Sequence, residues 1–202
     1  GVSSWAALGY PKGKDNFKRY WPADLNIEGR DQFRGWWNSQ IILSEISFNK
    51  KPYNNILVHG MVLDLEKRKM SKSLGNIVSP NDVIEKFGRD FLRYYFAKFS
   101  KGDDFGYDED EFKEINKVFM ILNNVDSYVN QLSKNKSKLE TEDKWILSKF
   151  YNLIVNVKDA YNEYKLYEAV QKIEAFVLDL SRKYIQMTRE RADETYQILN
   201  EI

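Results

Sequence analysis

The densest group of chemically useful side chains is a basic loop in the first half of the chain. It reads Lys67-Arg68-Lys69-Met70-Ser71-Lys72-Ser73-Leu74-Gly75-Asn76. The cationic side chains can neutralise a polyphosphate, and the hydroxyls and backbone N–H groups can donate hydrogen bonds to its oxygens. Glycine and serine would let the loop close over a nucleotide and reopen. The loop therefore suits a triphosphate, and a solvated lysine-rich turn is the alternative.

A second candidate group lies where a short predicted strand meets a predicted helix. The strand covers about residues 25–27 and ends at Glu28-Gly29, and the helix covers about residues 31–48. Ligands of α/β sheets bind beyond the carboxyl ends of the strands. Glu28 and Asp31 could accept hydrogen bonds from ribose hydroxyls or a substrate ammonium group, and Gly29 would allow close approach of the backbone. Helix capping by the two carboxylates is an alternative that can coexist with ligand contact.

The chain has a single histidine, His59, and no cysteine. This composition excludes disulfides, thiol nucleophiles, thiolate zinc sites and histidine-rich metal clusters within the chain, so we expect no protein-bound metal. His59 lies on a second predicted strand, about residues 54–63, which reads as buried because it is apolar. A phosphate or loop contact and a structural role both remain open for His59.

The elements that position these residues change character along the chain. Residues 1–22 are loop-like, and strand, helix and strand over residues 25–63 predict a βαβ unit with a parallel sheet. Ser79 and Pro80 predict a helix start, Gly88 predicts its end in a left-handed conformation, and a further helix is expected at about residues 90–99. From about residue 111, three apolar series with helical period predict a helical bundle. We therefore predict an α/β fold followed by an all-α region, with domains at residues 1–75, 76–110 and 111–202.

Composition sets broad limits on the function. The 202 residues include 31 basic and 30 acidic side chains, so the net charge of +1 neither demands nor excludes a polyanionic partner. No apolar run is long enough to suggest a membrane span, and a soluble, cytoplasmic protein is expected. The chain opens on Gly1-Val2-Ser3-Ser4-Trp5, without an initiator methionine, which reads like the middle of a loop. We expect a piece of a longer protein.

Three stretches resemble one family. Lys69-Met70-Ser71-Lys72-Ser73 matches the second signature of class I aminoacyl-tRNA synthetases, and it follows a strand containing His59-Gly60, as in that family. Residues 28–39 resemble the pattern Glu-Gly-x-Asp-Gln-x-Arg-Gly-Trp-aromatic-Asn-Ser of the isoleucyl-tRNA synthetases. The valyl and leucyl members have other residues at this place. Residues 145–148 and 180–184 resemble, more weakly, helices of the family's anticodon-binding domain.

The resemblance implies the second half of a Rossmann-like nucleotide-binding fold with an appended helical bundle. It implies that Lys69 and Lys72 are catalytic. The ATP contacts that it implies are His59, Gly60, Met61, Val62, Met70, Ser71, Lys72 and Ser73, with adenine read by the strand backbone. The aminoacyl-adenylate contacts that it implies are Glu28, Gly29, Asp31, Gln32 and Trp36, of which Trp36 would form a wall of the isoleucine pocket. Packing against the sheet is the alternative for Trp36 and is expected for Trp37.

Cations near the carboxyl terminus are candidates for contacts with tRNA. Arg182, Lys183, Arg189 and Arg191 place positive charge along the last predicted helix, as phosphate contacts would require. The alternative is a solvated helix face, because Glu190, Asp193 and Glu194 lie among them.

The resemblance also implies a reaction and its partners. Isoleucine and ATP, the latter with Mg²⁺, would give isoleucyl-adenylate, followed by transfer to tRNA(Ile). The family's first signature, of His-x-Gly-His type, and its editing domain are absent from this chain. We therefore expect the chain alone to be inactive and to need the N-terminal half of the catalytic domain. A valyl- or leucyl-type synthetase and a non-catalytic RNA-binding module are the alternatives.

Overall fold

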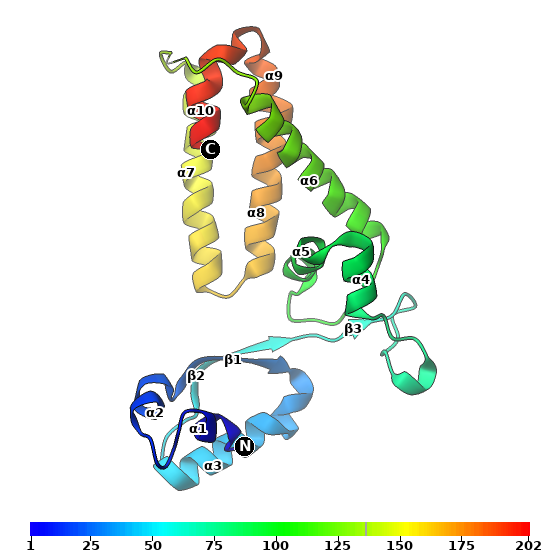
Figure 1. Cartoon of the computed structure of the whole chain (residues 1–202), viewed down its shortest axis with the longest axis vertical. Helices are drawn as coiled ribbons and strands as arrows, with labels where there is room; N and C mark the ends of the chain where they lie inside the picture. Colours follow the sequence, from blue (N-terminus) through cyan, green and yellow to red (C-terminus); the bar gives the residue numbers. More distant parts are fainter. Residues whose placement is uncertain (136) are drawn as a thin grey trace. The chain divides into compact units, whose positions relative to one another are not determined.

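The computed structural model describes residues 1–135 and 137–202, and the chain divides into two compact units. Unit 1 contains Gly1–Leu63 and Gly102–Phe105, and unit 2 contains Asp64–Lys101 and Gly106–Ile202. Figure 1 colours the chain from blue at the N-terminus to red at the C-terminus. The three domains expected from the sequence stay a prediction.

Unit 1 is built on a parallel pair of strands. β1 (Ala23–Gly29) pairs with β2 (Tyr53–His59), and α3 (Trp36–Phe48) lies between them in the chain. Gly29 is the register partner of His59, so the carboxyl ends of both strands lie side by side. The predicted βαβ unit and parallel pairing are confirmed. Parallel strands require such a crossover, and a helix supplies it.

Several local expectations for unit 1 are corrected. Residues 1–22 are not only loop, because they contain α1 (Ser3–Ala7) and α2 (Asp15–Tyr20). The predicted helix at residues 31–48 starts as a 3₁₀ turn, η1 (Arg30–Arg34), because Gly35 has non-helical angles of φ −119° and ψ −117°. The strand predicted at residues 54–63 is interrupted after His59 and resumes as β3 (Val62–Leu63). β2 is also not buried as predicted, since Ile56 is 42% exposed.

The core of unit 1 is aromatic. Trp5, Phe17 and Trp37 are its buried members. Phe48, at the end of α3, lies 4.8 Å from Trp5 and 5.2 Å from Phe17 between ring centroids. Edge-on and tilted rings at such distances are favourable. This cluster fixes the end of α3 against the N-terminal segment.

Unit 2 begins with the basic loop and two short helices. The loop contains one 3₁₀ turn, η2 (Lys72–Leu74), and is followed by α4 (Pro80–Phe87) and α5 (Arg89–Phe99). The predicted start of α4 is confirmed, with Ser79 at the N-cap position and Pro80 in the first turn, although the Ser79 side chain makes no capping hydrogen bond. Gly88 ends α4 with φ +99° as predicted, but its ψ of 155° is not that of a left-handed helix. β4 (Phe105–Gly106), whose first residue belongs to unit 1, pairs with β3 of unit 1.

The rest of unit 2 is the predicted helical bundle. α6 (Asp110–Val129), α7 (Thr141–Asn162) and α8 (Leu166–Asp179) carry the three apolar series, and α7 and α8 run side by side (Figure 1). The third series is not one helix to its end, because a π-helical turn, η3 (Leu180–Tyr184), follows α8. Then come α9 (Ile185–Met187), η4 (Arg189–Thr195) and α10 (Tyr196–Glu201). The core contains Ile146, Phe176, Leu180, Tyr184, Ile198 and Leu199. No helix in the described ranges is long and apolar enough to span a membrane.

Candidate functional site

The carboxyl edge of the parallel strands brings together four of the predicted ligand-binding residues. Glu28 and Gly29 end β1, Asp31 follows in η1, and His59 ends β2. Gly29 is buried, and a Cβ atom there would lie 2.7 Å from Asp31 Oδ1 and 3.4 Å from His59 Cε1. A side chain at position 29 would displace the Asp31 carboxylate from its present place. The edge therefore presents an acid and an imidazole beside one backbone segment, where α/β sheets bind ligands.

Gln32 links this edge to the first turn of α3. Its Oε1 accepts a hydrogen bond from the Trp36 backbone N–H at 3.0 Å, and its Nε2 donates one to Asp31 Oδ2 at 2.9 Å. One side chain thus caps the helix and orients the carboxylate. Trp37 packs in the core as expected, with its Nε1–H donated to Asn26 Oδ1 at 3.0 Å. Trp36 is only half-buried and so retains surface for a ligand.

The segment after β2 is tied down by residues that are distant in sequence. His59 Nδ1 donates to the Gly60 carbonyl oxygen at 2.8 Å, so Nε2 carries no proton in the neutral ring. The Met61 N–H donates to Asp104 Oδ1 at 2.8 Å, and the Met61 carbonyl oxygen accepts from the Phe105 N–H at 3.1 Å. If the Met61 backbone reads adenine as predicted, adenine would have to replace Asp104 as the acceptor for the Met61 N–H. Alternatively, adenine would donate a hydrogen bond to the second lone pair of the Met61 carbonyl oxygen.

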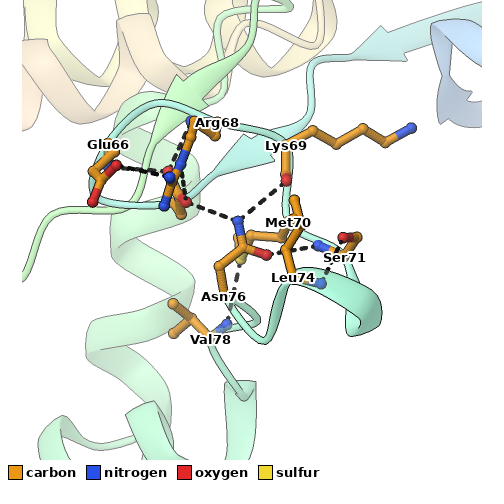
Figure 2. Close-up of polar contacts among 9 residues, drawn as sticks. Glu66, Arg68, Lys69, Met70, Ser71, Leu74, Asn76 and Val78 are labelled. Atoms are coloured by element: carbon orange, nitrogen blue, oxygen red, sulfur yellow. Dashed lines mark hydrogen bonds and ion pairs between the residues drawn. The ribbon is translucent and has the colours of Figure 1, made fainter.

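The basic loop at residues 67–76, called the signature loop from here on, is held by hydrogen bonds, several of which are drawn in Figure 2. Lys69 and Lys72 are exposed, whereas Met70 and Ser71 are half-buried. The Met70 sulfur accepts from the Val78 N–H at 3.3 Å, and Ser71 Oγ accepts from the Leu74 N–H at 3.3 Å. The hydroxyl groups of Ser71 and Ser73 are hydrogen-bonded to each other, with 3.2 Å between the two Oγ atoms. In Figure 2 the Lys69 side chain extends away from this network.

The charges of the loop are suited to an anion. Within Asp64–Lys101, neither the Lys69 nor the Lys72 ammonium group lies within ion-pairing distance of a carboxylate. Gly75, directly after η2, has φ +65°, a conformation that other residues adopt with difficulty. The loop thus presents two unpaired cations from a fixed backbone. Over the described ranges, no cluster of three or more His, Asp or Glu side chains could hold a metal ion.

Sequence reasoning missed Asp64 and Asn76, which organise this loop. Asp64 is 6% exposed and accepts hydrogen bonds from the Glu66 and Arg68 N–H groups, from Arg68 Nε and from Asn76 Nδ2. The bond from the Arg68 backbone and then that from Asn76 lower the pKa of Asp64 to about 2. An aspartate at the end of a strand and just before a turn is the local signal that could have identified it.

The predicted tRNA-contacting cations fall into two classes. Arg182, Lys183 and Arg189 are exposed, and Lys183 also pairs with Asp179 at 2.6 Å. Arg182 and Lys183 line a surface hollow whose other walls are Thr141, Glu142, Trp145, Gln186 and Met187.

Arg191 differs from the other three cations. Its side chain is only 19% exposed, and its guanidinium group donates to both oxygens of buried Asp143. The hydrogen bond to Asp143 raises the pKa of Arg191 against the effect of burial. In this arrangement Arg191 is occupied within the bundle, and a phosphate would have to compete with Asp143.

Comparison with known proteins places this arrangement in a family. A sequence model described as tRNA synthetases class I (I, L, M and V) matches residues 1–108, more than half of the chain. The chain belongs to the class I tRNA synthetases. A second sequence model, described as the anticodon-binding domain of tRNA ligase, matches residues 143–202, which include most of α7 and all of α8 to α10.

Curated relatives of this synthetase chain are similar over most of its length. An isoleucine–tRNA ligase of Methanosarcina barkeri is 40% identical over 205 aligned residues, which cover 94% of this chain and 19% of the relative. An isoleucine–tRNA ligase of Methanothermobacter marburgensis is 41% identical, covering 95% of this chain and 20% of the relative. The chain thus spans about a fifth of the length of these relatives.

Solved synthetase structures share the fold. The methionyl-tRNA synthetase of Mycobacterium tuberculosis bound by methionyl-adenylate has a TM-score of 0.78 at 24% identity, covering 96% of this chain and 42% of that structure. The LeuRS of Agrobacterium radiobacter K84, in a ternary complex with tRNA and LeuAMS, has a TM-score of 0.70 at 19% identity. The match covers 98% of this chain and 28% of that structure. These likenesses confirm the predicted fold class, a Rossmann-like α/β part followed by an all-α part.

Proposed function

We propose that this chain is part of an isoleucine–tRNA ligase. The enzyme would join isoleucine and ATP to form isoleucyl-adenylate and pyrophosphate, and would then transfer isoleucine to tRNA(Ile). Family membership alone does not decide whether the amino-acid substrate is isoleucine, leucine, methionine or valine. The observation that favours isoleucine is the stretch at residues 28–39, supported by relatives of about 40% identity that are named isoleucine–tRNA ligase.

The carboxyl edge of β1 and β2 would bind the adenylate. Glu28 and Asp31 would accept hydrogen bonds from the ammonium group of isoleucine or from ribose hydroxyls. Gly29 would let the ligand approach the backbone, and Gln32 would keep Asp31 oriented through the hydrogen bond between them. The half-buried Trp36 would supply an apolar wall for the side chain of isoleucine.

The signature loop would act on the triphosphate. Negative charge moves onto the pyrophosphate as it leaves, and Lys69 and Lys72 would stabilise that charge electrostatically, without transferring a proton. Met70 and Ser71 would hold the loop backbone, and the Ser71 and Ser73 hydroxyls would donate hydrogen bonds to phosphate oxygens. Mg²⁺ would enter with ATP, because it is commonly held by substrate phosphates with few protein ligands.

The helical bundle would contact tRNA. Arg182, Lys183 and Arg189 are exposed and could neutralise phosphates, which would make binding dependent on salt. Arg191 would support this surface from within, through its pairing with Asp143.

We expect the chain alone to lack adenylation activity. It contains a single histidine and therefore no His-x-Gly-His signature, so half of the ATP site would have to come from other parts of the enzyme. The compartment in which the enzyme works is expected to be the cytoplasm, as for other proteins of translation.

The test is amino-acid-dependent exchange of pyrophosphate into ATP by the full-length protein. Isoleucine should support exchange with a higher kcat/KM than valine, leucine or methionine. A preference for one of those three would replace isoleucine by that substrate. Absence of exchange with all four, together with retained binding of tRNA, would favour a non-catalytic RNA-binding module instead.

A further inference from the structure

Asn76 uses all of its side-chain hydrogen-bonding groups within the signature loop. Its Oδ1 accepts from the Ser71 N–H at 2.9 Å. Its Nδ2 donates to Asp64 Oδ2 at 2.8 Å and to the Lys69 carbonyl oxygen at 3.2 Å. The two residues on either side of Met70 are therefore fixed to one side chain (Figure 2).

Asp64 gives this arrangement a rigid base. Its Oδ1 is held by the Glu66 and Arg68 N–H groups at 3.0 and 2.7 Å, and its Oδ2 faces Arg68 Nε and Asn76 Nδ2. Backbone hydrogen bonds close the turn at residues 64–68. The Lys67 N–H donates to the Asp64 carbonyl oxygen, and the Asp64 N–H donates to the Arg68 carbonyl oxygen. A buried carboxylate with this many donors has little freedom to move.

Asn76 is one of the groups that fix the backbone beside the two lysines of the loop. Asn76 binds the Lys69 carbonyl oxygen directly and the N–H of Ser71, the neighbour of Lys72, and neither lysine makes an ion pair within Asp64–Lys101. The Asn76 bonds to Lys69 and Ser71 therefore set the lysine backbone together with η2, in which the Lys72 carbonyl oxygen accepts from the Gly75 N–H at 3.3 Å. Without those bonds, the lysines would sample many conformations, and ordering them on a triphosphate would cost conformational entropy.

We propose that Asp64 and Asn76 form a latch that holds the signature loop in shape, and that Asn76 is a positioning residue for the two lysines. This inference rests on the proposed function of the loop. The hydrogen bond between Asp64 and Asn76 joins the two ends of residues 64–76. These residues would therefore move over the nucleotide as one rigid segment. Neither latch residue needs to touch the substrate.

An exchange of the two side chains tests the latch. Asn76→Asp removes both donors of Asn76 and places a second carboxylate against Asp64, so it should open the latch. Adding Asp64→Asn should restore the bond between positions 64 and 76, although not the bond to the Lys69 carbonyl oxygen. The amide oxygen introduced at position 64 can still accept from the backbone of Glu66 and Arg68, and the amide nitrogen can donate to the new carboxylate at position 76.

Two measurements on the full-length protein are needed. Hydrogen exchange of the backbone at residues 68–76, without ATP, should be about tenfold faster in Asn76→Asp, the factor for one hydrogen bond to a charged group. The kcat of isoleucine-dependent pyrophosphate exchange should fall about tenfold, while the KM for isoleucine changes less than about twofold. The double variant should recover part of both losses, because the bond between positions 64 and 76 is restored while the Lys69 carbonyl oxygen and Arg68 Nε stay without their partners.

The outcomes separate the latch from the proposed function and from misfolding. The latch is refuted if loop exchange is the same in Asn76→Asp and the wild type, or if the double variant is no better than Asn76→Asp. A faster loop with unchanged kcat refutes the positioning role. Asn116→Asp, the same change on an exposed face of α6, controls for added charge, and α8 should exchange equally in all variants. A wild type inactive with every amino acid refutes the proposed function, whereas the loop measurement still tests the latch.

Discussion

Replacing Arg191 by methionine should destabilise the helical bundle, because it leaves Asp143 as a buried and unpaired carboxylate. Asp143 is 1% exposed, at the start of α7. It accepts from Arg191 Nη1 at 3.1 Å and Nη2 at 2.9 Å, from the Tyr184 hydroxyl at 2.7 Å and from the Glu140 N–H at 2.8 Å. The substitution removes both charged donors and keeps the two neutral ones.

The expected loss is about 3 kcal/mol in the free energy of unfolding, at the lower end of the range for breaking a buried ion pair from one side. The lower end applies because Tyr184 and the Glu140 backbone still donate to the carboxylate. Asp143→Asn added to Arg191→Met should recover part of the loss, since a neutral amide can still accept from Tyr184. Arg182→Met, at an exposed arginine nearby, should cost less than about 0.5 kcal/mol.

Native-state hydrogen exchange of α7 and α8 in the full-length protein measures this effect. A loss of about 3 kcal/mol corresponds to exchange roughly 10²-fold faster for the amides that open with the bundle. Exchange as slow as in the wild type would refute the reasoning, and so would a double variant no more stable than Arg191→Met.

The effect should also depend on pH. Burial opposes ionisation of Asp143, but the hydrogen bonds from Arg191 and Tyr184 outweigh it, and its pKa is lowered. A carboxylate with a lowered pKa stabilises the fold above its unfolded pKa of about 3.9, and this contribution is lost as the pH falls through the folded pKa. Without Arg191, protonation of Asp143 relieves the buried charge. The difference between wild type and Arg191→Met should therefore shrink in acid, and a difference that stays constant between neutral and acid pH would exclude charge as its cause.

Three further perturbations follow from the structure. Lys72→Ala in the full-length enzyme should raise the barrier to adenylate formation by about 3 kcal/mol with little change in isoleucine binding, and equal losses in single-turnover rate and binding would exclude the electrostatic role. Gly60→Ala should displace the 102–105 segment, because the new Cβ would lie 1.9 Å from the Asp103 carbonyl oxygen, and unchanged hydrogen exchange at Met61 would contradict this. Glu174→Gln should loosen α5 from α8 by about 1 kcal/mol, because Tyr94 and Lys98 both donate to its Oε1, and exchange in α5 checks it.

The features that sequence predicted well are those encoded by neighbouring residues. The parallel pair, the start of α4 at Pro80 and the three amphipathic helices depend on local periodicity and on caps, which a single sequence shows. The signature loop was found through its composition. Its roles, and those of Glu28, Asp31 and the other candidate ligands, stay predictions.

The features that sequence missed depend on segments meeting across a long separation. Asp104 reaches the Met61 backbone and Asp143 reaches Arg191, at separations of 43 and 48 residues. No local pattern marks one carboxylate among 30 acidic residues as the partner of a given group. The wrong expectation of a buried β2 has a related cause, because an apolar run shows which residues can be covered but not which neighbours cover them.

The π-helical turn at Leu180–Tyr184 sets the phase of everything that follows α8. A π turn accommodates one residue more than an α-helical turn, and each residue rotates a helix by about 100°. Tyr184 consequently faces Asp143, while Arg182 and Lys183 lie outside. The number of residues in this turn thus fixes which side of the segment after α8 faces the bundle. Gain or loss of one residue there would turn the basic surface away from its present direction, even if buried Leu180 and Tyr184 were kept.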